Sequence, residues 1–147
     1  MSEVYIRNFT EGDIGEITVL MQKLCEITNI EFDPDRWQAS IEKQFQQFDL
    51  STMLIAEIDG TVAGMTFASI RRDFNMARFG YISNLIVDPR YRGQRIGENL
   101  MRAAVDFFRQ NHIESVRVTV RKESPEALNL LKKIGFDEIF TVMEQKI

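Results

Sequence analysis

The sequence contains very little cysteine and histidine, with one of each among 147 residues. A single cysteine, Cys25, excludes a disulfide within the chain, and one cysteine with one histidine cannot supply the usual tetrahedral zinc set. We therefore expect no structural metal. Proline is also scarce, and no stretch rich in glycine, proline or serine marks a linker. We expect one domain, residues 1–147, because a chain of this length can bury most of its apolar side chains in one core.

Long apolar runs are missing as well. Residues 1–7 carry acidic and polar groups and lack the apolar run of a signal peptide or membrane span, so we expect a cytoplasmic protein that does not bind membranes. The net charge of −4 and the pI near 5.1 argue against non-specific binding to nucleic acid or anionic lipid. The same charge favours cationic partners such as amines.

The residues that are present alternate between strand and helix patterns. Asp59-Gly60 is typical of a hairpin turn, Thr10 and Asp13 form a capping pair, and Asp33 precedes a proline at a helix start. After two N-terminal helices, helices alternate with strands, which predicts an α+β or mixed α/β fold. Strands are predicted near 5–9, at 53–57, 62–70, 80–87 and 116–120, and helices at 10–25, 33–48, 96–111 and 125–135; residues 137–146 favour extended structure.

The segment from Leu85 to Gly97 is the part of the sequence that indicates chemistry. A buried strand ends, a basic glycine-containing loop follows, and a helix begins. Free N–H groups and the positive end of the helix dipole favour anions there, and glycine lets a pyrophosphate approach the backbone. Arg90, Arg92 and Arg95 add positive charge. Taken alone, the segment could equally be a strand-to-helix turn with solvated arginines.

Two familiar phosphate-binding loops do not fit this segment. No lysine followed by serine or threonine comes after the glycines, as a P-loop requires. The third glycine of a dinucleotide-binding fingerprint is also absent. Another kind of phosphate loop must therefore be considered.

The segment resembles the central motif of the GNAT acetyltransferases, which is Gln/Arg-x-x-Gly-x-Gly/Ala after a strand carrying Leu-x-Val and a proline. The matching residues are Leu85, Val87, Pro89, Arg92 and Gly97, while Arg95 stands where the family usually has its first glycine. A second block is similar to the family's later Asn-x-x-Ala-x-x-Leu-Tyr-x-Lys-x-Gly-Phe pattern. It matches at Ala127, Leu130, Lys133, Gly135 and Phe136, with Ser124 and Leu131 in place of the asparagine and the tyrosine.

The resemblance implies the GNAT acyl-CoA N-acyltransferase fold, a mostly antiparallel sheet with a splayed parallel strand pair, flanked by helices. It also implies acetyl-CoA as the cosubstrate, with the pantetheine arm in the gap between the splayed strands and Ser124 hydrogen-bonded to it. The backbone of Leu85, Ile86 and Val87 would pair with pantetheine amides, and the amides of Arg92, Gly93, Gln94, Arg95, Ile96 and Gly97 would hold the pyrophosphate.

For catalysis, the resemblance assigns the backbone N–H of Leu85 to the oxyanion. The family often places a general base two or four residues earlier, where this chain has Ser83 and Tyr81. Serine can only order a water, and tyrosine has an ordinary pKa near 10. Period-two alternation predicts Tyr81, Ser83 and Leu85 on one face of the strand, where packing explains the first two side chains equally well.

Other residues have simpler explanations. His112 follows a predicted helix end far from the phosphate loop, and Cys25 lies among apolar residues of a helix. Glu26 and Glu31 lie near the connection of the first two helices and could attract a cationic amine. The apolar loop 74–79 is typical of a ligand pocket or a dimer contact.

The sequence therefore predicts an N-acetyltransferase that moves an acetyl group from acetyl-CoA to a primary amine by direct attack in a ternary complex. The acceptor would be a small molecule or a peptide, and the protein a monomer or a homodimer. One alternative is a catalytically weak CoA-binding sensor or interaction module, because Ser83 and Leu131 replace the usual proton-transfer groups. A general nucleotide-binding domain is a third hypothesis.

Overall fold

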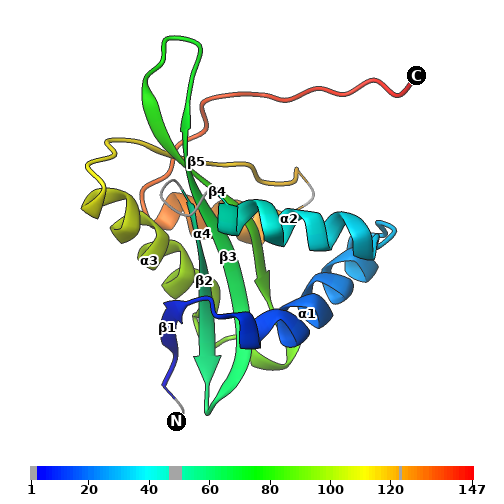
Figure 1. Cartoon of the computed structure of the whole chain (residues 1–147). Helices are drawn as coiled ribbons and strands as arrows, with labels where there is room; N and C mark the ends of the chain where they lie inside the picture. The colour runs from blue at the N-terminus through cyan, green and yellow to red at the C-terminus, as the bar shows by residue number, and fades with distance from the viewer. Residues whose placement is uncertain (1–2, 47–50, 123) are drawn as a thin grey trace.

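A five-stranded sheet lies between two layers of helices in the computed structural model, which describes residues 3–46, 51–122 and 124–147 (Figure 1). Within these ranges no helix has the length and apolar character needed to cross a membrane. The strands are β1 (Tyr5–Asn8), β2 (Ser51–Ile58), β3 (Thr61–Arg72), β4 (Arg78–Val87) and β5 (Val116–Val118). The helices are α1 (Ile14–Ile27), α2 (Pro34–Gln46), α3 (Ile96–Gln110) and α4 (Pro125–Lys133), with short 3-10 turns η1 (Glu11–Asp13) and η3 (Pro89–Tyr91).

The strands follow chain order across the sheet, β1-β2-β3-β4-β5. The first three pairings are antiparallel and only β4–β5 is parallel, which confirms the predicted fold class. β5 ends two residues earlier than predicted, and residues 137–147 form no strand. The predicted continuation of the second helix to Phe48 lies outside the described residues.

The two predicted helix starts are confirmed. Asp13 accepts a hydrogen bond from the Thr10 backbone N–H at 2.9 Å and two from the Arg7 guanidinium at 2.8 Å each. These donors hold the pKa of the buried Asp13 carboxyl below its ordinary value, with Arg7 the largest cause. Asp33 accepts from the backbone N–H of Asp35 and Arg36 at 3.0 and 3.2 Å, as an N-cap residue does.

The sheet separates two hydrophobic cores. On one face, α1 and α2 bury Ile17, Leu20 and Trp37 against β2 and β3. On the other, α3 and α4 bury side chains such as Phe108 and Leu131. Figure 1 shows these two helix pairs on opposite sides of the strands.

Close packing requires a glycine at position 80. A Cβ built on Gly80 would lie 2.6 Å from Cγ of Phe108, whose ring is fully buried on α3. We predict that Gly80→Ala lowers the free energy of unfolding by about 1–3 kcal/mol, because the ring must move in a filled core. Urea denaturation measures this change.

Gly15 is the matched control, since a Cβ there meets nothing within 4 Å and the residue lies in α1. Gly15→Ala is expected to leave stability unchanged or raise it by up to about 1 kcal/mol through helix propensity. Equal stability of the Gly80→Ala protein and the wild type would contradict this account of α3 packing.

Candidate functional site

Strand β4 contains one extra residue beside its neighbour β3. Met65 pairs with Ile86 and Phe67 pairs with Ser83. Phe67 is two residues from Met65 on β3, whereas Ser83 is three residues from Ile86 on β4, so β4 has one residue more between the two pairs. Asn84, within this step, has a left-handed φ of 53°. Thr66, fully buried opposite the extra residue, donates its hydroxyl to the Ser83 carbonyl at 3.0 Å. This arrangement is a β-bulge, in which the added residue re-aims the side chains that follow.

The bulge changes which side chains share a face of the sheet. Ser83 pairs with Phe67 and Ile86 with Met65, and both partners belong to the core under α1 and α2. Leu85 instead packs against the opposite core, under α3 and α4. The prediction that Tyr81, Ser83 and Leu85 lie on one face is therefore wrong, because simple alternation does not continue through an inserted residue.

The pairing of β4 with β5 stops just before the bulge. The register ends at Ile82 opposite Val118, and the Tyr81 hydroxyl lies 2.6 Å from Oγ1 of Thr119 at the same level. From residue 83 to residue 87, β4 pairs with no strand on that side among the residues that the structure describes. Its backbone edge there is available to a ligand that supplies amide or carbonyl groups.

The loop after β4 leads into α3 through two residues with a left-handed backbone conformation. Gly93 has φ +81°, and Arg95, the residue before α3, is also left-handed at φ 58°. Gly93, Gln94 and Arg95 are exposed, whereas the Ile96 side chain is buried in the core, so position 96 offers a ligand only its backbone. A Cβ built on Gly97 would make ordinary contacts at 3.8 Å with Val87 and 3.9 Å with Leu130. Backbone N–H groups at such a helix start favour an anion.

Asp88 fastens this loop to the rest of the fold. Its carboxylate is buried and accepts from the Arg90 backbone N–H at 3.0 Å and from Nη2 of Arg90 at 2.8 Å. Nζ of Lys23 on α1 lies 3.4 Å away, and the Asp88 N–H donates to the Ala63 carbonyl at 2.8 Å. Hydrogen bonds from Arg90, followed by the charge of Lys23, lower the pKa of Asp88 to about 2.

The loop arginines divide into two kinds. The Arg90 guanidinium is committed to Asp88, so it adds less positive charge to the loop than its sequence position indicates. Arg92 and Arg95 are exposed and form no ion pair with any described residue. The free positive charge thus lies along residues 92–95, beside the N-terminus of α3.

A small cavity of about 180 Å³ adjoins this loop. It lies between α1 and the end of β4, and Lys23 and Arg92 are its two cationic lining residues; the others are Leu20, Leu24, Ile27, Leu85, Ile86, Val87 and Pro89. A larger hollow of about 640 Å³ is lined by β1, β2 and the C-terminal half of α3, away from the glycine loop. Of these two hollows among the described residues, the small cavity is the one that touches the segment from Leu85 to Gly97.

Residues 20–136 match the acetyltransferase (GNAT) family. The chain belongs to this family.

Two relatives and one solved structure illustrate the similarity. An uncharacterized N-acetyltransferase of Methanocaldococcus jannaschii is 24% identical over 136 residues, covering 90% of this chain and 60% of that protein. An N-alpha-acetyltransferase of Sulfurisphaera tokodaii is 29% identical over 97 residues, covering 60% of this chain and 58% of that protein. The chain thus spans less than two thirds of the length of either relative. The aminoglycoside N-acetyltransferase AAC(6')-Iy in complex with CoA has the same fold, with a TM-score of 0.85 at 20% identity over 100% of this chain and 96% of that one.

Residues of the second GNAT block have mixed surroundings. Ser124 is half-buried at the N-cap of α4, where its side chain makes no capping hydrogen bond. Leu131, at the position where the family commonly has tyrosine, is buried in the core under α3 and α4. Lys133 lies 3.5 Å from the buried Glu98 and links α4 to the first turn of α3.

The other residues considered in the sequence belong to α1, to the connection after it and to the end of α3. His112 is exposed just past the end of α3, at the opposite end of that helix from Gly97. Cys25 is half-buried on α1. Glu26 and Glu31 are exposed on α1 and on the connection to α2.

Sequence reasoning missed four residues that shape the candidate site: Asn84, Thr66, Lys23 and Asp88. Asparagine is disfavoured inside strands yet tolerates left-handed φ, so Asn84 amid apolar strand residues was an available signal of a bulge. Thr66 and Lys23 gave no comparable signal, because their roles depend on neighbours 17 and 65 residues away in the chain.

We predict that Asp88 makes stability depend on pH in the acid range. Its folded pKa near 2 lies below the ordinary 3.8, so its contribution of about 2 kcal/mol is present above pH 4 and is lost as pH falls towards 2. Asp88→Asn should therefore lower the free energy of unfolding at neutral pH, and its difference from the wild type should shrink between pH 4 and pH 2. Urea unfolding at a series of pH values tests this, and a pH-independent difference would contradict it.

Proposed function

We propose that this chain transfers an acetyl group from acetyl-CoA to a primary amine by direct attack in a ternary complex. The observation that carries the proposal is the unpaired edge of β4 from residue 83 to 87, which leads directly into the anion-favouring loop. An unpaired strand edge suits the amides of a pantetheine arm, and the loop suits a pyrophosphate. Membership of the GNAT family supports this combination.

Each binding residue has a proposed role. The backbone of Leu85, Ile86 and Val87 pairs with the pantetheine, and Ser124 adds a side-chain hydrogen bond to it. The amides between Arg92 and Gly97 hold the pyrophosphate, with the side chains of Arg92 and Arg95 neutralising its charge. Arg95 is exposed, so its side chain can stay outside the space that the phosphates occupy and act on them through its charge, while its amide faces them.

The reaction joins the amine nitrogen to the thioester carbonyl carbon. The amine attacks in its neutral form, the carbonyl oxygen becomes an oxyanion, and the backbone N–H of Leu85 stabilises that charge. The carbon–sulfur bond then breaks, the amide product loses the former amine proton, and CoA leaves as thiolate or thiol. A thiol pKa of about 8.5 lets the thiolate leave without a strong general acid.

Neither of the two candidate side chains, Ser83 and Tyr81, is a strong base for removing the proton from the attacking amine. Ser83 is half-buried on the α1 and α2 face, where it can position the amine or a water molecule. The Tyr81 hydroxyl is already hydrogen-bonded to Thr119 at 2.6 Å. We therefore assign Ser83 and Tyr81 to positioning the acceptor and its water, with the amine losing its proton largely to solvent.

Two kinds of acceptor amine are consistent with the relatives. An N-alpha-acetyltransferase is one relative, and an aminoglycoside N-acetyltransferase has the same fold. The acceptor panel should accordingly include an aminoglycoside, a polyamine, an amino acid and a short peptide with a free N-terminus.

We predict amine-dependent release of free thiol from acetyl-CoA with at least one amine of that panel. Because no strong base is assigned, kcat/KM should rise roughly tenfold per pH unit below the pKa of the amine. A flat profile between pH 7 and 9 would contradict the assignment of Ser83 and Tyr81.

Calorimetric titration with acetyl-CoA, CoA and ATP completes the test: CoA binding without turnover supports a sensor, and equal affinity for ATP supports a nucleotide-binding domain.

Gly97→Asp should weaken acetyl-CoA binding on the order of 100-fold or more, because it places a negative charge beside the phosphates. Gly97→Ala is the matched control. Its Cβ fits at 3.8 Å from Val87, so both the fold and the affinity should be little changed. Calorimetry with both variants, after thermal unfolding shows that each is folded, measures the effect. Unchanged affinity of the Gly97→Asp protein would refute the location of the phosphate site.

A further inference from the structure

The outer end of the β3–β4 hairpin extends beyond both helix layers (Figure 1). Phe67 of β3 is still covered by α1 and α2, since it belongs to their core and its ring contacts that of Trp37. Two and four residues further along β3, Ser69 is half-buried and Arg71 is exposed. The helices therefore cover this face of the sheet as far as Phe67, and the face is open at Arg71.

A row of side chains leads from Ser83 along this open face to the hairpin. β3 and β4 pair in regular register outward from Ser83. Every second pair therefore presents its side chains on the same face as Ser83. The members of the row are Ser69 and Arg71 of β3 and Tyr81 and Phe79 of β4.

The guanidinium of Arg71 is held in place within this row. Its carbon lies 4.2 Å from the centre of the Tyr81 ring, and its Nε donates to Oγ of Ser69 at 3.1 Å. Neither of its Nη groups has a partner among the residues that the structure describes. A guanidinium that lies over a ring keeps its edge free, and that edge matches two oxygens of a carboxylate or a phosphate.

The surroundings of Arg71 carry an excess of positive charge. Residues 69–81 contain three arginines and one acid, and residues 115–122 contain three basic residues and no acid. The acid, Asp73, accepts from the backbone N–H groups of Asn75 and Ala77 at 2.8 and 3.0 Å within the hairpin turn. Although the whole chain has a net charge of −4, this end of the sheet favours an anion over a second cationic group.

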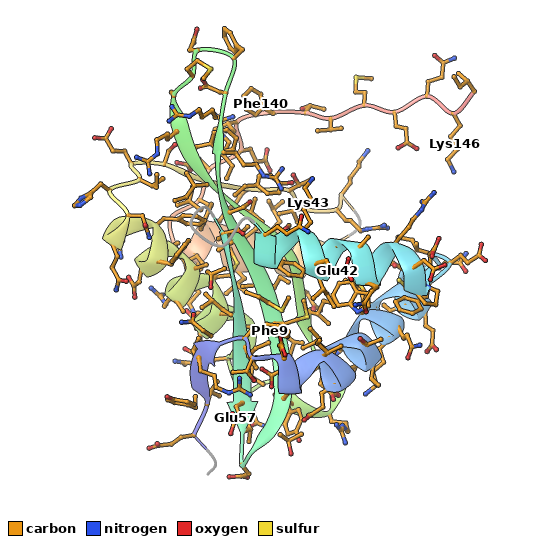
Figure 2. All side chains as sticks on the ribbon, in the orientation of Figure 1. Phe9, Glu42, Lys43, Glu57, Phe140 and Lys146 are labelled. Atoms are coloured by element: carbon orange, nitrogen blue, oxygen red, sulfur yellow. The ribbon has the colours of Figure 1, made fainter. Side chains whose placement is uncertain are left out.

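Arg117 of β5 contributes charge to the same surface but is itself engaged. Its guanidinium carbon lies 4.2 Å from the centre of the Phe79 ring and 5.3 Å from that of Phe140. In Figure 2, Phe140 lies beside the hairpin end of the sheet, and Glu57 lies at the opposite end. Arg117 also lies 4.0 Å from Asp73. The free hydrogen-bond donors of this surface are therefore those of Arg71.

Arg71 lies within reach of the proposed reaction centre. Tyr81, which supports the guanidinium, is two residues before Ser83, where the acceptor amine is positioned in the mechanism proposed above. Two strand residues span about 7 Å. A molecule that contacts both Ser83 and Arg71 therefore needs an amine and an anionic group roughly six bonds apart, as in two extended residues.

We propose that the acceptor amine carries a carboxylate or a phosphate group, and that Arg71 binds this group and thereby selects the acceptor. The proposal rests on the proposed acetyl transfer and narrows its acceptor to molecules such as a dipeptide, an ω-amino acid or an aminoalkyl phosphate. Polyamines and aminoglycosides are disfavoured, because they bring further positive charge to this end of the sheet.

The test compares kcat/KM for acetyl transfer to δ-aminovalerate and to pentylamine, which has a similar length and no carboxylate, at one pH. The wild type should prefer δ-aminovalerate roughly 10- to 100-fold, as expected for hydrogen bonds between charged groups. In the Arg71→Gln protein this ratio should fall to near unity. Arg71→Lys keeps the charge but not the paired donors, so its ratio should be intermediate. The matching aminobutylphosphonate shows whether a phosphate-like group is preferred to a carboxylate.

Arg72→Gln is the matched control, because it removes the same charge from the next residue. The Arg72 side chain lies on the opposite face of β3 by alternation and donates to the Met76 carbonyl at 2.9 Å. The Arg72→Gln protein should keep the ratio of the wild type. Both arginines are exposed, and thermal unfolding checks that each variant is folded.

Three results would overturn the proposal while leaving acetyl transfer intact. They are equal kcat/KM for the two amines in the wild type, a preference that survives in the Arg71→Gln protein, and transfer to other amines of the panel but to neither of these two. Absence of transfer to every amine would instead refute the proposed function, and this proposal with it.

Discussion

The extra residue in β4 is the constraint on which the rest of the site depends. With regular alternation, every second side chain of β4 would face the same helix layer along the whole strand. The strand could then also pair with β5 along its length. The insertion at Asn84 exchanges the faces instead, so that Ile86 enters the core of α1 and α2 while Leu85 joins the core of α3 and α4. The parallel ladder to β5 ends at Ile82, immediately before the exchange. One residue thus separates a packed half of the strand from a half whose edge is open.

The open half of β4 leads into a loop whose position is fixed by the contacts of Asp88. Asp88 joins four parts of the fold through β4 itself, the η3 turn, the β3 backbone and Lys23 on α1. Its buried charge is balanced by Arg90, which leaves Arg92 and Arg95 to face an anion. Although the chain as a whole carries a net charge of −4, this short stretch is locally positive. That local charge suits the acidic cosubstrate proposed above, and the overall charge does not repel the cationic amine of the proposed acceptor.

Much of the fold could be predicted from sequence patterns, because periodicity reports burial directly. The helix caps at Asp13 and Asp33 and the order of elements follow from local chemistry. The bulge could not be derived from periodicity, since an inserted residue looks like a short error in the alternation. The role of Thr66 depends on a partner that only the fold brings near. The shortening of β5 and the unpaired state of residues 137–147 depend equally on which strands meet, which local sequence does not determine.

The most direct test of the site is hydrogen exchange of the backbone amides with and without CoA. The account predicts slower exchange on adding CoA at residues 84–87 and 92–97, and unchanged exchange in the distant hairpin tip at 73–77. Slower exchange only along the hollow between β1, β2 and α3, or no change at residues 92–97, would contradict it.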